Sequence, residues 1–203
     1  NEFIKVLKIC SVISFRYSAI GKLNPNEMER VYNKSAIRVS NGEIKTAREV
    51  FETLKSIYID DETFEHSFSS VSIDTGRNRK LVKYILLSIE NQMANKDYDF
   101  DESGATIEHI LPINPKEDSN WYDSFSIEEM EKLNLRLGNY LLLESEINKE
   151  IGNEVFDVKI IEYKKSSYKI ASTFKYENWN PDKLKQHQKD FAKQAKTIWK
   201  ISY

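Results

Sequence analysis

Two short apolar segments constrain the fold of this chain more than any other feature of its sequence. The first runs from Thr106 to Pro112 and places Glu108 directly before His109, with isoleucine and leucine on both sides. Short apolar runs of this kind are typical of buried strands. Proline cannot donate a hydrogen bond to a sheet, so Pro112 marks the point where this strand gives way to a loop.

The second segment, Leu137 to Leu143, is apolar apart from one amide, Asn139. Another amide, Asn148, follows where the pattern changes from a strand to a helix. Polar groups at the ends of two strands and at the start of a helix can converge on one point. The two segments therefore bring together one imidazole, one carboxylate and two amides as a candidate site.

Helical patterns fill most of the remaining chain. Apolar residues recur at helical spacing, and cap residues precede several of the segments. The expected helices cover residues 1–20, a segment starting at Asn24-Pro25, one from about Glu43, Lys80 to Met93, one after Ser126, one at Ser145 or Glu146, one containing Phe156, and one from Asn180-Pro181 to the end. The fold class is therefore α+β and mostly helical, with residues 1–79 as a helical bundle or linker and residues 80–203 as the domain that carries the site.

The amino-acid composition excludes several classes of protein. The 203 residues carry a formal net charge of -2, which excludes a uniformly basic nucleic-acid coat. Residues 159–200 nevertheless hold eleven lysines and four acidic residues, a local excess of +7 that would attract phosphate. Cys10 is the only cysteine, so neither a disulfide nor a multi-cysteine zinc site is expected. The absence of a long apolar run predicts no membrane span, and a reducing, cytoplasmic location follows as the expectation.

The candidate site suits hydrolysis of a phosphodiester, which needs an activated water and a stabilised leaving oxygen. A histidine acting as general base contributes about 10²–10⁴-fold to the rate. A hard divalent ion, which prefers oxygen ligands, can neutralise the phosphate. Neighbouring side chains of a strand point to opposite faces, so Glu108 and His109 diverge unless the strand ends or bends there. Pro112 and the following loop favour such a bend.

The same residues resemble the HNH nuclease motif, also called the His-Me finger or ββα-metal motif. The matching pieces are Glu108 to Pro112, then Leu137 to Leu143, then Asn148. More narrowly, the chain is similar to the C-terminal nuclease domain of GmrSD-type, modification-dependent restriction endonucleases and related anti-phage proteins. This resemblance covers roughly Lys80 to Trp199 and implies a β-hairpin and a helix embedded among helices.

The resemblance also implies residue roles. His109 would be the catalytic general base, and Asn139 a catalytic amide that orients His109 or supports the loop. Glu108 and Asn148 would bind one divalent metal ion, Mg²⁺ or Mn²⁺. Lys159 would contact phosphate.

Lys164 and Lys165 follow Lys159 as further candidate nucleic-acid contacts. The expected function is a metal-dependent DNA endonuclease that nicks or cleaves phosphodiester bonds, as the effector domain of a bacterial anti-phage or restriction protein. The partner of this domain would be DNA, and modified phage DNA is one candidate substrate. An upstream NTP-hydrolysing or sensing domain of the same protein is expected to be missing, because the chain begins at Asn1 like a fragment.

Two alternatives stay open on the sequence. The chain could be a non-catalytic nucleic-acid-binding or regulatory module that keeps the motif, or a nuclease that cleaves RNA. The other two histidines, His66 and His187, are expected at the surface, one in a polar segment and the other on a lysine-rich helix.

Overall fold

The computed structural model describes residues 1–101 and 104–202 of the chain. The chain forms two compact units, one made of Asn1–Phe68 with Ala195–Tyr203 and the other of Ser69–Gln194. The division after Phe68 comes earlier than the boundary expected near residue 79. The reason is that the long helix expected from Lys80 begins at Thr75 and packs against the strands of the second unit.

The first unit is entirely helical in the residues that the structure describes. Its elements are α1 (Glu2–Ser14), a π-helical turn η1 (Phe15–Ile20), α2 (Pro25–Ser40), α3 (Ala47–Leu54), a 3₁₀ turn η2 (Lys55–Ile57) and α4 (Asp61–Phe68). The start of α2 is as expected, because Asn24 caps it by accepting a hydrogen bond from the backbone of Asn26. Helix α3 starts later than Glu43, since Thr46 and Glu49 form a capping box there.

Helix α4 was not expected from the polar segment that contains it. The Asp60 side chain accepts hydrogen bonds from the backbone nitrogen of Thr63 at 2.8 Å and from its hydroxyl at 3.0 Å. This is a local start signal, and Phe64 and Phe68 bury the apolar face of the helix. The exposed side of α4 carries His66, which lies at the surface as predicted.

The second unit holds a two-stranded sheet among helices, so the chain is α+β and mostly helical, as predicted. The elements are α5 (Thr75–Ala94), β1 (Ala105–His109), α6 (Trp121–Ser124), α7 (Ile127–Leu133), a 3₁₀ turn η3 (Leu137–Asn139), β2 (Tyr140–Glu144), α8 (Ser145–Ile151), α9 (Phe156–Tyr163), α10 (Lys169–Ser172) and α11 (Pro181–Ile198), whose last residues belong to the first unit.

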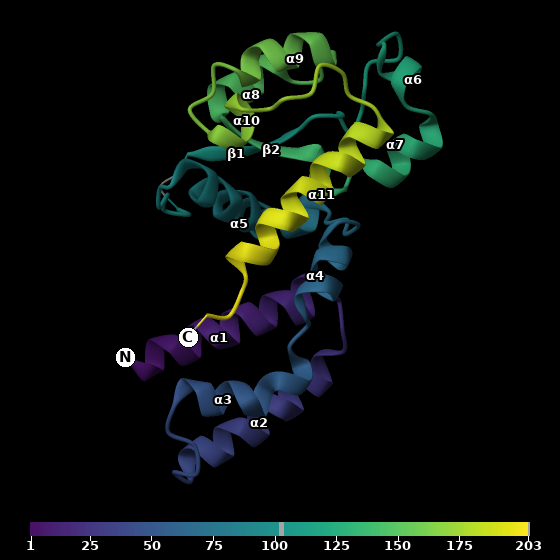
Figure 1. The fold of residues 1–203 in the computed structure, drawn as a ribbon. Coiled ribbons are helices and arrows are strands. Elements are labelled where there is room, and N and C mark those ends of the chain that lie inside the picture. The colour runs from purple at the N-terminus through teal and green to yellow at the C-terminus, as the bar shows by residue number, and fades with distance from the viewer. Residues whose placement is uncertain (102–103, 203) are drawn as a thin grey trace. The chain divides into compact units, whose positions relative to one another are not determined.

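Strands β1 and β2 pair antiparallel, with Ala105 opposite Glu144 and His109 opposite Tyr140. Helix α5 covers one face of this hairpin and α8 covers the other, while α10 packs against β2 and α5 (Figure 1). Because both faces are covered, β2 is a continuous apolar run rather than an alternating one. No helix in the described part of the chain combines the length and the apolar content needed to cross a membrane.

The second apolar segment does not begin as a strand. Its first residues form η3, which turns the chain into β2. Gly138 lies in this turn, where a Cβ atom would come within 2.5 Å of the Leu184 carbonyl oxygen and 2.7 Å of the Gln188 side chain. Helix α11 therefore approaches the turn as closely as only a glycine allows.

Candidate active site

His109 is the last residue of β1, and its ring is half-buried. Its Nε2 atom lies 3.2 Å from the hydroxyl oxygen of Thr75, the first residue of α5. The ring of Tyr140 meets the imidazole edge-on, with 4.8 Å between the ring centroids. Burial lowers the pKa of His109 to about 4, with smaller contributions from the positive charges of Lys159 and Arg79. The imidazole is therefore neutral near pH 7.

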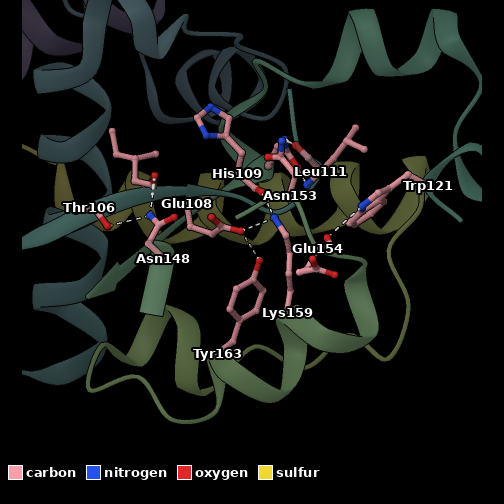
Figure 2. A network of polar contacts seen from close by, with 12 residues as sticks. Thr106, Glu108, His109, Leu111, Trp121, Asn148, Asn153, Glu154, Lys159 and Tyr163 are labelled. Carbon is pink, nitrogen blue, oxygen red and sulfur yellow. Dashed lines mark hydrogen bonds and ion pairs between the residues drawn. The ribbon is translucent and has the colours of Figure 1, made fainter. Parts of the chain in front are cut away.

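Glu108 points to the other side of β1, as strand geometry requires (Figure 2). Its side chain is 3% exposed. One carboxylate oxygen, Oε1, accepts hydrogen bonds from Lys159 Nζ at 2.6 Å and from the Tyr163 hydroxyl at 2.9 Å. The strand ends without a bend that would bring the carboxylate and the imidazole together, so the two groups stay on opposite faces.

Lys159 comes from α9 and is fully buried. Besides Glu108, its ammonium group donates to the backbone oxygen of His109 at 2.8 Å. Burial lowers the pKa of Lys159 and raises the pKa of Glu108, and each partner's charge opposes the shift of the other. The expected phosphate contact by Lys159 does not agree with this position, because the ammonium group has no exposed surface to offer.

Asn148 lies on α8, on the same side of β1 as Glu108 (Figure 2). Its Nδ2 atom donates to the Thr106 hydroxyl at 2.8 Å and to the Ile107 backbone oxygen at 3.1 Å. These two bonds orient the amide and direct its Oδ1 atom away from the strand backbone. The structure thus brings Asn148 and Glu108 together, while His109 faces away from both.

Asn139 is fully buried at the end of η3. Its Oδ1 atom accepts from the backbone nitrogen of Leu111 at 2.8 Å, and its Nδ2 atom donates to the Leu111 oxygen at 2.9 Å and the Asn134 oxygen at 3.2 Å. The Asn139 backbone oxygen accepts from the nitrogen of Ile110. Of the two roles expected for this amide, the geometry supports the second, since Asn139 clamps the loop that follows His109.

A comparison with known protein families shows to which family the chain belongs. The model of the C-terminal domain of GmrSD restriction endonucleases matches residues 58–194, about two thirds of the chain. The chain belongs to this GmrSD family. The match confirms the resemblance inferred from the motifs and identifies a nuclease domain of the restriction-endonuclease kind. No curated protein matches the sequence.

The GmrSD domain matched here contains every residue of the candidate site. Its family is one of nucleases, which commonly use a divalent metal ion. The candidate ligand atoms are Oδ1 of Asn148 and the second carboxylate oxygen of Glu108, and both are hard oxygen ligands of the kind that Mg²⁺ prefers. No group of three or more His, Cys, Asp or Glu side chains in the described residues could hold a metal. The Glu108 carboxylate is buried and already paired with Lys159, so these residues as they stand do not fit a divalent ion that keeps most of its water ligands.

The remaining predicted residues of the GmrSD domain lie at its surface or in its core. Lys164 and Lys165 follow α9 and are exposed, with Lys165 paired to Glu162 at 2.5 Å. The prediction that His187 lies at the surface is wrong. Its ring is 7% exposed, packs among aromatic rings, and its Nδ1 atom lies 2.8 Å from the Gly138 oxygen.

Sequence reasoning assigned no role to two residues that touch this GmrSD site. Thr75 contacts the His109 ring from a helix 34 residues earlier in the chain, and no local pattern reveals it. Tyr163 contacts Glu108 from α9. It lies four positions after Lys159, on the same face of the helix, so its spacing was the available signal.

Proposed function

We propose that this domain is a metal-dependent DNA endonuclease that hydrolyses phosphodiester bonds as the effector of a bacterial restriction or anti-phage protein. The observation that carries the proposal is the family match, which spans the whole site. The geometry supports it, since a neutral imidazole held in one orientation lies at the end of β1. A cytoplasmic location, where invading DNA would be met, belongs to the same proposal.

His109 is the proposed general base. With a hydrogen on Nε2 donated to the Thr75 hydroxyl, the lone pair of Nδ1 is available to take a proton from the attacking water. Asn139 keeps the following loop in place, and Lys159 fixes the backbone oxygen of His109 itself. Thr75 therefore orients the ring of His109, and Lys159 fixes its main chain. General-base catalysis needs such a preorganised base.

A divalent ion, Mg²⁺ or Mn²⁺, belongs to the proposal on the strength of the family alone. Its expected ligands, Glu108 and Asn148, lie on the face of β1 opposite the His109 ring, and Glu108 is paired with Lys159 in the interior. Lys164 and Lys165 are proposed to contact the DNA backbone. Arg79 is a further candidate, because its exposed guanidinium group acts electrostatically on His109 from α5. The proposal also includes an NTP-hydrolysing or sensing domain of the same protein as the partner of this nuclease domain.

A plasmid-nicking assay tests the function. We expect Mg²⁺-dependent conversion of supercoiled DNA to the nicked or linear form, stopped by EDTA. His109→Ala should lower the rate at least about 10²-fold. The matched control is His66→Ala, which removes an exposed histidine of α4 and should leave the rate unchanged. Equal rates for the two variants would refute the assignment of the base, and cleavage of RNA alone in a parallel reaction would refute DNA as the substrate.

A further inference from the structure

A groove in the first unit is lined by basic and hydroxyl side chains. It lies between α2 on one side and α3 with η2 on the other, and its volume is about 170 Å³ (Figure 1). None of the residues that line it is acidic, and all of them belong to the described part of the chain. The polar side chains of this basic groove are those of Arg30, Lys34, Ser35, Arg38, Thr53 and Ser56.

The three basic residues of the groove form a row along α2. Arg30, Lys34 and Arg38 follow one another at intervals of four residues, which places them on one face of the helix. With a rise of 1.5 Å per residue, the row is about 12 Å long. One strand of duplex DNA advances by about 3.4 Å along the helix axis per phosphate. The row is therefore long enough to meet several consecutive phosphates, whereas a single phosphate ion would meet only part of it.

The two arginines are oriented by acidic side chains that do not line the groove. Arg30 donates from Nε at 3.0 Å and from Nη2 at 2.6 Å to Glu27, and Arg38 donates from Nε at 3.2 Å to Glu43. The remaining nitrogens, Nη1 of Arg30 and both Nη atoms of Arg38, make no hydrogen bond within the described residues. Exposed ion pairs contribute only about 0–1 kcal/mol, so these pairs steady the guanidinium groups and leave donors for an anion.

The middle of the row and the opposite wall complete the groove. Lys34 is exposed and forms no ion pair within residues 1–101 and 104–202. On the opposite wall, Thr53 Oγ1 donates to the Val50 oxygen at 2.7 Å, so the Ser35 hydroxyl, 2.6 Å from Thr53 Oγ1, donates to Thr53. Ser56 is exposed, and its hydroxyl can donate to a phosphate oxygen. The wall that faces the basic row therefore carries no negative charge.

We infer that the basic groove binds consecutive phosphates of a DNA backbone, so that the first unit takes part in holding the DNA. The inference rests on the proposed nuclease function for the identity of this nucleic acid. Backbone contacts carry no sequence information, so the groove would raise the affinity for any duplex and leave the choice of sequence or modification to other residues. Each cation that neutralises a phosphate releases a counterion, so binding through the groove weakens as the salt concentration rises.

The first experiment measures the affinity of the full chain for a fluorescent duplex by anisotropy, in EDTA and over a series of salt concentrations. Two variants with the same change in net charge are compared, and the control replaces exposed basic residues that do not line the groove. The groove variant is Arg30→Gln/Lys34→Gln/Arg38→Gln, and the control variant is Lys5→Gln/Lys8→Gln/Arg48→Gln.

We expect the groove variant to bind the duplex at least about tenfold more weakly than the control variant. The slope of log affinity against log salt should become shallower by about 2.7 in the groove variant, because each phosphate contact contributes about 0.9. Equal affinities and equal slopes of the two variants would overturn the inference. Thermal unfolding of both variants checks that the substitutions leave the fold intact.

A single substitution keeps the test independent of the two ion pairs. Lys34→Gln leaves Arg30 paired with Glu27 and Arg38 paired with Glu43, and it should make the salt slope shallower by about 1. An unchanged slope would contradict the row of contacts. If inorganic triphosphate stabilised the unchanged protein while the groove and control variants bound DNA equally, the groove would belong to a small phosphorylated ligand and the inference would be overturned.

Failure of the nuclease proposal gives a different result. It would appear as intact plasmid in the nicking assay, while the difference in DNA affinity between the groove variant and the control variant persists. Failure of the present inference would appear as equal DNA affinity of these two variants, with plasmid nicking retained in both.

Discussion

Replacing Asn139 by leucine is the most direct test of the loop clamp. Leucine fills similar space but offers no hydrogen bonds, so the amide's three bonds to Leu111 and Asn134 are lost. Leu111 is 0% exposed, so its backbone nitrogen and oxygen are left without these partners inside the protein. A buried polar group without a partner costs about 1–3 kcal/mol. With partial relaxation of the loop, we expect Asn139→Leu to lower the free energy of unfolding by about 3 kcal/mol.

The effect is large enough to measure by thermal unfolding. For domains of about 60–250 residues, a loss of 1 kcal/mol lowers the unfolding midpoint by about 2–8 °C. The midpoint of the second unit should therefore fall by about 10 °C. Tryptophan fluorescence reports on this transition, because Trp121 and Trp179 are both buried in the second unit. The matched control is Asn153→Leu, which removes one exposed hydrogen bond to the Asn114 oxygen and should change stability by no more than about 0.5 kcal/mol.

Two results would refute this reasoning in different ways. If Asn139→Leu and Asn153→Leu unfolded at the same temperature, the clamp would contribute nothing to the stability of the loop. If Asn139→Leu kept the midpoint of the unchanged protein but lost DNA cleavage, the amide would act on the reaction itself, as the first of the two roles expected from the sequence.

Three further predictions follow from the structure. Thr75→Val should slow plasmid nicking about tenfold with little change in stability, because the hydroxyl that holds the His109 ring is lost, whereas Thr75→Ser should keep the rate. Gly138→Ala should destabilise the fold by about 1–3 kcal/mol in urea unfolding, because the added Cβ would lie 2.5 Å from the Leu184 oxygen. Burial lowers the pKa of His187 from 6.5 to about 4, so the fold holds it neutral while the unfolded chain takes up a proton. The neutral His187 therefore stabilises the fold above pH 6.5, and about 3 kcal/mol of the free energy of unfolding is lost as the pH falls from 6.5 towards 4. A His187→Gln variant whose stability had the same pH dependence would contradict this prediction.

Several features of this protein could be predicted from neighbouring residues in the sequence. Asn24 before Pro25, and Ser126 with Glu129, cap α2 and α7 where the patterns placed them. The apolar run from Leu137 marked the second strand of the hairpin, although its first three residues form a turn. Helix caps and strand patterns depend on contacts between residues that are close in the sequence, so they can be predicted from local sequence alone.

The members of the candidate site were also visible as residue types. Glu108 beside His109, with Asn139 and Asn148 later in the chain, was enough to suggest the family that the comparison then confirmed. The expectation that the carboxylate, the imidazole and the amides converge on one point is not met. Strand β1 does not bend before it ends, so Glu108 and His109 lie on opposite faces.

The sequence could not decide which lysine faces DNA and which is buried. Lys159 looked like its neighbours Lys164 and Lys165, yet it alone of these three pairs with Glu108 in the interior. His187 likewise lies on a lysine-rich helix but faces the aromatic core. The cost of burying a charged or polar group depends on the partners that the fold brings to it, and these come from residues far away in the chain. Local sequence specifies the elements of this domain, and only their packing assigns each polar side chain to solvent, to a clamp or to the site.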